Sequence, residues 1–190
     1  MTETTRVLVG YATAAGSTQG IAERLATDLI DVAAVDVRPV GPDTDPARYD
    51  AFVIGSAVHN QAWLPAALDF LGRGGPVLAH RPLWCFSVAG AAPRGPVSRA
   101  VVRMQVERIE RGFPHGVAPR EHRVFAGVVV VDGLPLWGKL FWRAIGGRPG
   151  DHRDWPAIDR WSADVAAALV GVRHDRTESP ADPVRPYPTS

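Results

Sequence analysis

A segment of small and hydroxylated residues near the N-terminus is the first part of the sequence whose residue types suit chemistry. It runs from Ala12 to Thr18 (ATAAGST) and follows an apolar run, Arg6 to Tyr11. Small residues let the backbone curl around an anion, and a helix that begins near Thr18 would aim N–H groups and a positive dipole end at it. Because hydroxyls accompany these amides and no lysine does, the segment suits a terminal phosphomonoester held by neutral donors.

Other phosphate-binding patterns do not match this segment. A nucleoside triphosphate loop would need Gly-Lys-Ser/Thr, and a dinucleotide fingerprint would space its glycines differently. The alternative without a ligand is an ordinary turn from strand to helix, in which Ser17 or Thr18 caps the helix. Taken alone, the loop leaves both interpretations open.

The elements that would position this loop alternate along the chain. Apolar runs predict strands at 6–11, 34–37, 50–56, 83–88 and 123–131. Helical spacing predicts a helix after Thr18 and others at 65–72, 96–111 and 155–171. Such alternation indicates βαβ units, a parallel sheet and helices on both of its faces. Ligands of such sheets bind beyond the carboxyl ends of the strands, where the loops 12–18, 57–61 and 89–95 are expected to meet.

Composition indicates one globular domain, which we expect to span residues 1–172. The chain has 190 residues, 46% of them hydrophobic and 22% charged, and its formal net charge is +1. Residues 173–190 are polar and proline-rich, and we expect a disordered tail there. The single cysteine, Cys85, excludes a disulfide framework and is expected to be a core residue. The N-terminus does not read as a signal peptide, so a cytoplasmic location is expected.

No metal site and no nucleic-acid site are expected. The residues His115, His122 and His152 lack metal-ligand spacing. The basic segment 94–123 carries seven Arg and three Glu, which is too little charge for a nucleic-acid footprint. The aromatic segment from Leu134 to Ile145 (LPLWGKLFWRAI) has two interpretations. It is either an interfacial helix or lid that makes a peripheral membrane contact near a lipophilic substrate, or a helix that packs back on the sheet.

Several of these segments resemble the flavodoxin family. The residues Tyr11 to Thr18 (YATAAGST) look like its phosphate loop, and Asp50 to Ala57 (DAFVIGSA) looks like its third strand. More narrowly, the chain resembles the flavodoxin-type, quinone-dependent protoporphyrinogen oxidases. That narrower resemblance is carried by Ala12 to Thr18, Ala67 to Phe70 (ALDF), Phe86 to Val88 (FSV), Phe125 to Gly127 (FAG) and Asp154-Trp155.

The resemblance implies a flavodoxin-like, doubly wound five-stranded parallel sheet of order 2-1-3-4-5 with FMN at the switch point. The flavin would carry the chemistry, so no catalytic side chain is expected. The implied cofactor-binding residues are Thr13, Ala14, Ala15, Gly16, Ser17 and Thr18 at the phosphate, Ala57, Val58, His59 and Asn60 along one side of the ring, and Ala89, Gly90, Ala91, Ala92, Arg94 and Gly95 along the other.

Two departures bear on the narrower resemblance. Flavodoxins often stack Trp or Tyr on the flavin from the second loop, where this chain has His59 and Asn60, with Trp63 three residues further on. His59 is either a flavin contact or an exposed loop residue, and Trp63 either shields the ring or packs in the core. Arg94 either contacts the flavin or an acidic substrate, or is solvated. The segment 146–153 is also shorter than in the oxidases.

Three functions remain open on the sequence. The first is an FMN-dependent oxidoreductase that passes electrons between an organic donor, for which the resemblance suggests protoporphyrinogen, and a quinone-like acceptor. The second is a flavodoxin-type electron carrier, and the third is a flavodoxin-fold binding module without a cofactor. Residues 1–93 carry six Arg and nine Asp or Glu, and the basic segment begins beside the expected flavin edge. Because low-potential carriers benefit from negative charge around the flavin, this distribution favours the enzyme.

Overall fold

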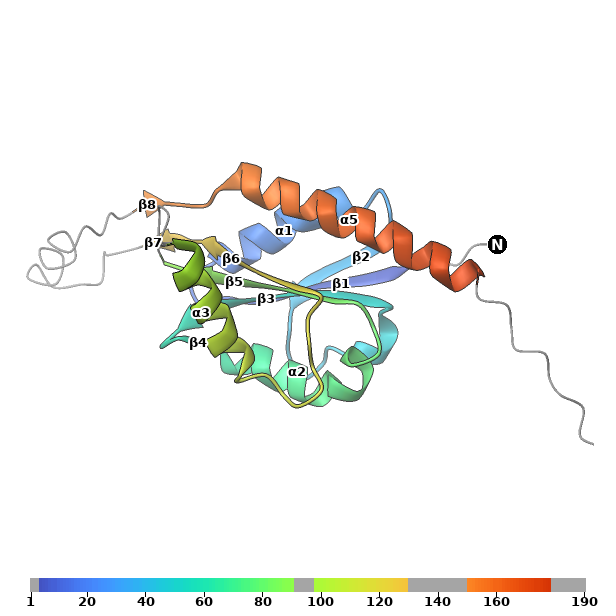
Figure 1. Ribbon diagram of the computed structural model, residues 1–190, viewed down its shortest axis with the longest axis horizontal. Helices are drawn as coiled ribbons and strands as arrows, with labels where there is room; N and C mark the ends of the chain where they lie inside the picture. The colour runs from blue at the N-terminus through green and yellow to red at the C-terminus, as the bar shows by residue number, and fades with distance from the viewer. Residues whose placement is uncertain (1–3, 91–97, 130–149, 179–190) are drawn as a thin grey trace, which may run out of the picture.

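The computed structural model describes residues 4–90, 98–129 and 150–178. At its centre lies a parallel sheet of order β2-β1-β3-β5-β6, which confirms the order 2-1-3-4-5 predicted from the sequence (Figure 1). A short strand, β4 (Ala62–Trp63), turns back antiparallel to the end of β3. The parallel strands are β1 (Arg6–Ala12), β2 (Ala34–Pro39), β3 (Ala51–His59), β5 (Leu83–Ala89) and β6 (Glu121–Ala126).

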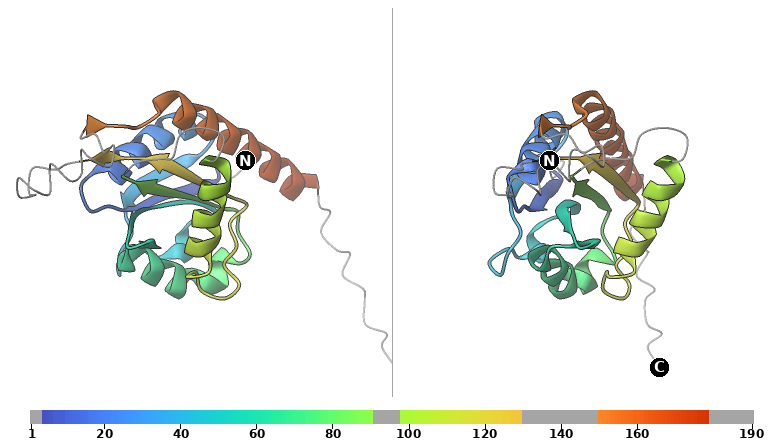
Figure 2. Two further views of the ribbon diagram at one scale, coloured as in Figure 1. Left: turned by 60° about the vertical axis from the view of Figure 1, so that its left-hand side comes forward. Right: turned by 90° about the vertical axis from the view of Figure 1, so that its left-hand side faces the viewer.

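Helices cover both faces of the sheet, as predicted. The helices α1 (Ser17–Leu29) and α5 (Trp155–Glu178) lie side by side on one face. The helices α2 (Pro65–Leu78) and α3 (Ser98–Glu110) lie on the other (Figures 1 and 2). A short 3-10 helix, η1 (Pro46–Arg48), precedes β3.

Each face of the sheet has its own hydrophobic core. Alternation along β1 sends Val7 and Val9 to the α1/α5 side and Leu8 to the α2 side, because successive side chains of a strand point to opposite faces. The stripes predicted for α1 and α5 are confirmed, since their apolar residues are all buried: Ile21, Leu25, Leu29, Ile158, Trp161, Val165 and Leu169. Cys85 is fully buried in the second core, as expected.

Several element boundaries differ from the sequence expectation. The fifth parallel strand begins at Glu121 and stops at Ala126, whereas the expected strand covered 123–131. After Gly127 the chain leaves the sheet, and β7 (Val128–Val129) pairs antiparallel with β8 (Gly150–Asp151). Helix α2 continues past 72 to Leu78 with Pro76 inside it. The carbonyl that this proline leaves unpaired belongs to Gly72, which is exposed and therefore open to water.

The disorder expected for residues 173–190 was wrong for residues 173–178. Helix α5 continues to Glu178, so residues 173–178 are helical. Extending an existing helix fixes one residue for each added hydrogen bond, which is far less costly than starting one, and polar composition did not reveal this. Residues 179–190 and the segment from Leu134 to Ile145 lie outside the described residues. Across the described ranges, no helix has both the length and the apolar character needed to cross a membrane.

Candidate cofactor-binding site

The carboxyl ends of β1, β3, β5 and β6 meet at one edge of the sheet, which faces the viewer in the right-hand view of Figure 2. Their register is parallel throughout, with Ala12 opposite Ser56, Ala57 opposite Val88, and Ala89 opposite Ala126. Since parallel strands end together, the loops after them share this edge. The structure therefore brings together the described parts of the three loops singled out in the sequence.

The first loop is closed by its own side chain and by a glycine. The Gly16 N–H donates to Thr13 Oγ1 over 2.9 Å. Gly16 is the N-cap of α1 and has φ +83°, a conformation that favours glycine. The alternative in which Ser17 or Thr18 caps the helix is wrong, because α1 begins at Ser17 and no side chain caps it. The exposed residues Ala14 and Ala15 complete the loop.

The first turn of α1 provides backbone N–H donors beside the loop. By helix geometry the N–H groups of Ser17, Thr18 and Gln19 have no acceptor within the helix. Thr18 is fully buried, and its Oγ1 has no hydrogen-bond partner among the residues that the structure describes. A buried hydroxyl without a partner costs about 1–3 kcal/mol. Unpaired amides, an unpaired hydroxyl and a helix N-terminus together fit the phosphate of FMN, whose oxygens accept hydrogen bonds.

Gly127 joins the first and third loops at the end of β6. Its N–H donates to the Ala89 carbonyl over 2.7 Å, and the next N–H, of Val128, donates to Ser17 Oγ over 3.0 Å. A Cβ at Gly127 would lie 2.8 Å from Val88 Cγ1, so this close approach requires glycine. Gly127 and Val128 were not among the residues expected in the site from the sequence. The signal for Gly127 lies in the segment Phe125 to Gly127, which carries part of the family resemblance.

The second loop is a tight hairpin between β3 and β4. Ala57 and Val58 are half-buried, whereas His59 and Asn60 are exposed. The turn places Asn60 at φ 50° and Gln61 at φ 63°, both in the left-handed region. Non-glycine residues occupy that region only at a cost, which is tolerated most often at functional positions.

Trp63 does not reach the site surface. It is 3% exposed, and its Nε1–H donates to Ser87 Oγ over 2.7 Å. This confirms the interpretation of Trp63 as a core residue. The exposed side chains of the hairpin are therefore those of His59, Asn60 and Gln61, with Ala62 beside them.

The third loop is described only where it begins. Ala89 is half-buried at the end of β5, and Gly90 is exposed. The remaining predicted residues of this loop, Ala91, Ala92, Arg94 and Gly95, lie outside the described residues.

The described parts of the three loops carry no acidic side chains. The segments 13–18, 57–62, 89–90 and 127–128 contain no Asp or Glu. Asp151, the last residue of β8, pairs across the ladder with Val128, and hydrogen bonds from Arg153 lower the pKa of its carboxyl to about 2. The Arg153 guanidinium stacks on Trp155 at 4.5 Å, and a Cβ on Gly20 would lie 2.7 Å from its Nη1. Arg153 therefore lies against the first turns of α1.

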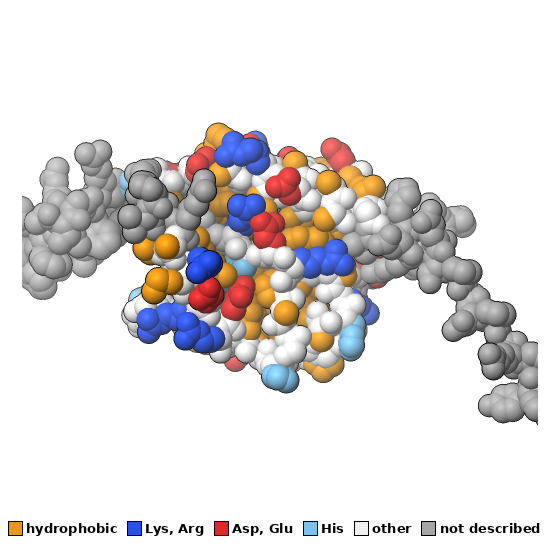
Figure 3. All heavy atoms as spheres, in the orientation of Figure 1, with side chains coloured by type: hydrophobic (Ala, Val, Ile, Leu, Met, Phe, Trp, Pro, Cys, Tyr) orange, Lys and Arg blue, Asp and Glu red, His pale blue; other side chains and the backbone are white. Residues whose placement is uncertain are grey.

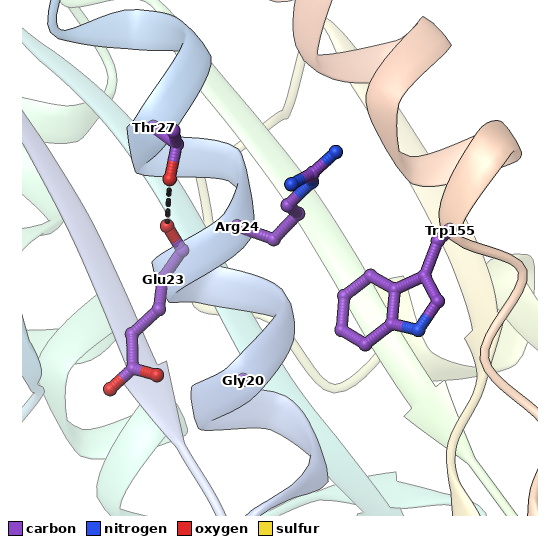
Figure 4. A pocket seen from close by; sticks show the side chains of 5 residues that line it. All are labelled: Gly20, Glu23, Arg24, Thr27 and Trp155. Atoms are coloured by element: carbon purple, nitrogen blue, oxygen red, sulfur yellow. Dashed lines mark hydrogen bonds between the residues drawn. The ribbon is translucent and has the colours of Figure 1, made fainter.

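A separate hollow of about 460 Å³ lies between α1 and α5 (Figure 4). It is lined by Gly20, Glu23, Arg24, Thr27 and Trp155. Arg24 is held by two hydrogen bonds to Asp159, of 2.7 and 2.9 Å. This hollow shares no lining residue with the predicted cofactor site.

The surface charges alternate in sign on the face that Figure 3 shows, where basic and acidic side chains lie next to one another. Ion pairs join Arg123 to Glu121 and Arg103 to Glu107. Within the described ranges, no group of three or more His, Cys, Asp or Glu side chains is placed to hold a metal ion.

Comparison with known proteins matches most of the chain to one family. Residues 8–154 match the family described as the flavodoxin domain. No curated protein matches the chain. Among solved structures, it is similar to the flavodiiron protein from Giardia intestinalis at 14% identity and a TM-score of 0.54, with 90% of this chain aligned to 37% of that one. It is also similar to the flavodoxin of Streptococcus pneumoniae TIGR4 at 13% identity and a TM-score of 0.50, with 86% of this chain aligned to 99% of that one.

At these sequence identities the solved structures establish likeness of fold alone. Membership of a family rests on the family match. The matched residues begin in β1 and extend to the start of α5, so they include every described loop of the candidate site. The match supports FMN as the cofactor expected from the sequence. Since the family match spans most of the length of this chain, the chain belongs to the flavodoxin domain family.

Proposed function

We propose that the protein binds FMN at the strand ends and acts as an FMN-dependent oxidoreductase. The observation that carries the proposal is the buried hydroxyl of Thr18 in the first turn of α1, which has no hydrogen-bond partner among the described residues. In this arrangement Thr18 Oγ1 and the first-turn amides donate to the phosphate, while the hydrogen bond between Gly16 and Thr13 fixes the curled shape of the loop. Bound FMN supplies the electron transfer, and the chain supplies position and electrostatics.

The isoalloxazine ring would lie between the exposed hairpin turn and the beginning of the third loop. His59 and Asn60 present exposed polar side chains on one side, and Gly90 leaves space on the other. The backbone hydrogen bond from the Gly127 N–H to the Ala89 carbonyl would lie at the floor of this site. These neutral groups would orient the ring without placing a carboxylate beside it.

The absence of acidic residues from the described loops favours an enzyme over an electron carrier. Negative charge beside a flavin disfavours its reduced anionic form and lowers its potential, and carriers also dock through such charge. The segments 13–18, 57–62 and 89–90 provide none. As redox partners we propose an organic hydrogen donor and a quinone-like acceptor, which the narrower resemblance of the sequence implies. The matches at Phe86 to Val88 and Phe125 to Gly127 support protoporphyrinogen as the first donor to assay.

The first test is a pair of titrations with the purified protein. FMN binding is followed by the quenching of flavin fluorescence, and riboflavin, which lacks only the phosphate, is the matched control ligand. The proposal expects FMN to bind at least tenfold more tightly than riboflavin, because each hydrogen bond to a charged group contributes about 1.5–3 kcal/mol. Equal affinities would place the phosphate elsewhere, and no binding of either ligand would refute the proposal.

A second test separates the enzyme from the carrier. The reduction midpoint of bound FMN is measured by dye equilibration, and turnover is assayed with protoporphyrinogen as donor and a soluble naphthoquinone as acceptor. A midpoint near that of free flavin with measurable turnover supports the enzyme. A midpoint far below it without turnover supports the flavodoxin-type carrier instead.

A further inference from the structure

A chain of four buried or half-buried polar groups crosses the α2/α3 side of the sheet behind the hairpin. Trp63 Nε1–H donates to Ser87 Oγ over 2.7 Å, and Ser87 Oγ lies 2.8 Å from His122 Nε2. His122 Nδ1 in turn lies 3.0 Å from Glu110 Oε1. Ser87 is 0% exposed and the His122 side chain is 1% exposed, whereas the Glu110 side chain is 35% exposed.

Only one arrangement of protons satisfies every group in this chain. Ser87 Oγ accepts from the indole of Trp63, so its own hydrogen is left to donate to His122 Nε2. The imidazole is then neutral, with its hydrogen on Nδ1, and it donates to the Glu110 carboxylate. Burial lowers the pKa of His122 to about 4, which agrees with a neutral ring. Burial and the neighbouring Glu107 carboxylate raise the pKa of Glu110.

Aromatic packing fixes the imidazole in the plane that these hydrogen bonds need. The Phe113 ring is stacked on His122, at 17° between planes and 5.9 Å between centroids. The Trp63 ring meets the imidazole edge-on at 5.6 Å and packs on Phe113 at 4.7 Å. The Phe113 and Trp63 rings therefore cover the imidazole, whose side chain is 1% exposed.

The order Ser87, His122 and Glu110 has the hydrogen-bond pattern of an activated serine, yet Ser87 is not placed to act as a nucleophile. Its Oγ is fully buried, and the Trp63 indole occupies the side on which a substrate would have to approach. A nucleophile needs access to substrate as well as a base. The chain of hydrogen bonds therefore acts on the residue at its inner end, which is Trp63.

Trp63 is the residue through which this chain reaches the cofactor site. It pairs across the hairpin with Val58, and Ala62 pairs with His59. The two residues between them, Asn60 and Gln61, are the ones held in the left-handed region. A strained turn persists only when its surroundings hold it. The hydrogen bond from Trp63 to Ser87 anchors β4 to the carboxyl end of β5.

We propose that His122 is a positioning residue for the cofactor site, which acts through Ser87 and Trp63 to hold the turn 59–62 in the shape that receives the flavin ring. The inference rests on the proposed FMN function. His122 orients the Ser87 hydroxyl so that its lone pairs face the indole N–H. Without His122, the Ser87 hydroxyl is free to rotate, the indole loses a fixed acceptor, and the strained turn relaxes.

The test uses His122→Phe, which keeps a ring against Phe113 and removes both hydrogen bonds. Ser87→Ala is the second variant, and it tests the same link if the first fails to fold. His80→Phe is the matched control, since His80 is exposed after the end of α2. Two readouts are taken from each protein: the indole N–H signal of Trp63 in ¹⁵N NMR without ligand, and the Kd for FMN from flavin fluorescence.

The expected result is that His122→Phe and Ser87→Ala shift the Trp63 indole signal, speed its hydrogen exchange and weaken FMN binding about tenfold. A tenfold change corresponds to about 1.4 kcal/mol. The double variant should be no weaker than either single one, because both substitutions break one chain. His80→Phe should leave both readouts unchanged.

Two results would overturn the inference while the proposed function stands. One is an unchanged Trp63 signal in His122→Phe, and the other is a shifted signal with FMN affinity equal to that of the wild type, which would make the chain a purely structural feature. If the wild-type protein itself fails to bind FMN, the proposed function fails and the positioning role fails with it. The wild-type titration therefore tells the two failures apart.

Discussion

Replacing Thr18 by valine should change stability and cofactor affinity in opposite directions. Valine has the shape of threonine with a methyl group in place of the hydroxyl. Thr18 is 0% exposed, and its Oγ1 has no partner within the described part of the chain. In the protein without ligand, Thr18→Val therefore removes a desolvated polar group that costs about 1–3 kcal/mol and loses no hydrogen bond.

We expect Thr18→Val to raise the free energy of unfolding of the ligand-free protein by about 1–2 kcal/mol, or Tm by roughly 2–6 °C for a chain of this length. FMN affinity should fall by about tenfold to a hundredfold, because one hydrogen bond to the phosphate is lost. In saturating FMN, the stability advantage of the variant should shrink by about 1.5–3 kcal/mol or reverse, since binding energy adds to folding energy.

The assay is thermal and urea unfolding with and without FMN, together with the fluorescence titration. Thr27→Val is the matched control on the same helix, because Thr27 is exposed and its hydroxyl donates to the Glu23 carbonyl over 3.1 Å (Figure 4). It should change stability by no more than about 0.5 kcal/mol and leave the Kd unaltered. A destabilised ligand-free Thr18→Val would show that the hydroxyl has a partner, and an unaltered Kd for FMN would show that the phosphate lies elsewhere. Either result refutes the reasoning.

Three further predictions concern the frame around the site. Gly55→Ala should lower the free energy of unfolding in urea by about 3 kcal/mol, because its Cβ would lie 2.0 Å from Phe86 Cζ, whereas Gly41→Ala, with nothing within 4 Å, should have little effect. Gln61→Gly should raise it by about 1 kcal/mol by relieving φ 63°, and a loss of stability would argue against this turn. Folding holds the pKa of His122 at about 4, below its ordinary value of 6.5, so the unfolded chain binds the proton more tightly. The contribution of His122 to the free energy of unfolding should therefore be greatest above pH 6.5. It should fall by up to about 3 kcal/mol as the pH drops towards 4. In urea unfolding at pH 7 and 4.5, His122→Phe should lose this part of the pH dependence, and an identical slope would contradict the assignment.

The parallel sheet and its helices were predictable because they depend on local periodicity. The continuous apolar strands and the stripe Ile21, Leu25 and Leu29 leave few ways to bury these side chains other than a sheet covered on both faces. The loop from Ala12 to Thr18 was predictable for a similar reason, since a glycine among small and hydroxylated residues specifies a tight turn into a helix. Where the signal was weaker, as at the end of β6 and in residues 173–178, the prediction was wrong.

The sequence by itself determined that strands alternate with helices and that a parallel sheet is covered on both faces, because these features follow from the spacing of apolar residues. The strand order was implied by the family resemblance, and the sheet confirms it. The tertiary structure alone decided which polar groups meet. Nothing in the spacing of Trp63, Ser87, Glu110 and His122 marks them as partners, since they come from four elements that only the packed sheet brings within hydrogen-bond distance. Thr18 was already a candidate from the sequence, but only the packing shows that its hydroxyl is buried and has no partner within the described part of the chain.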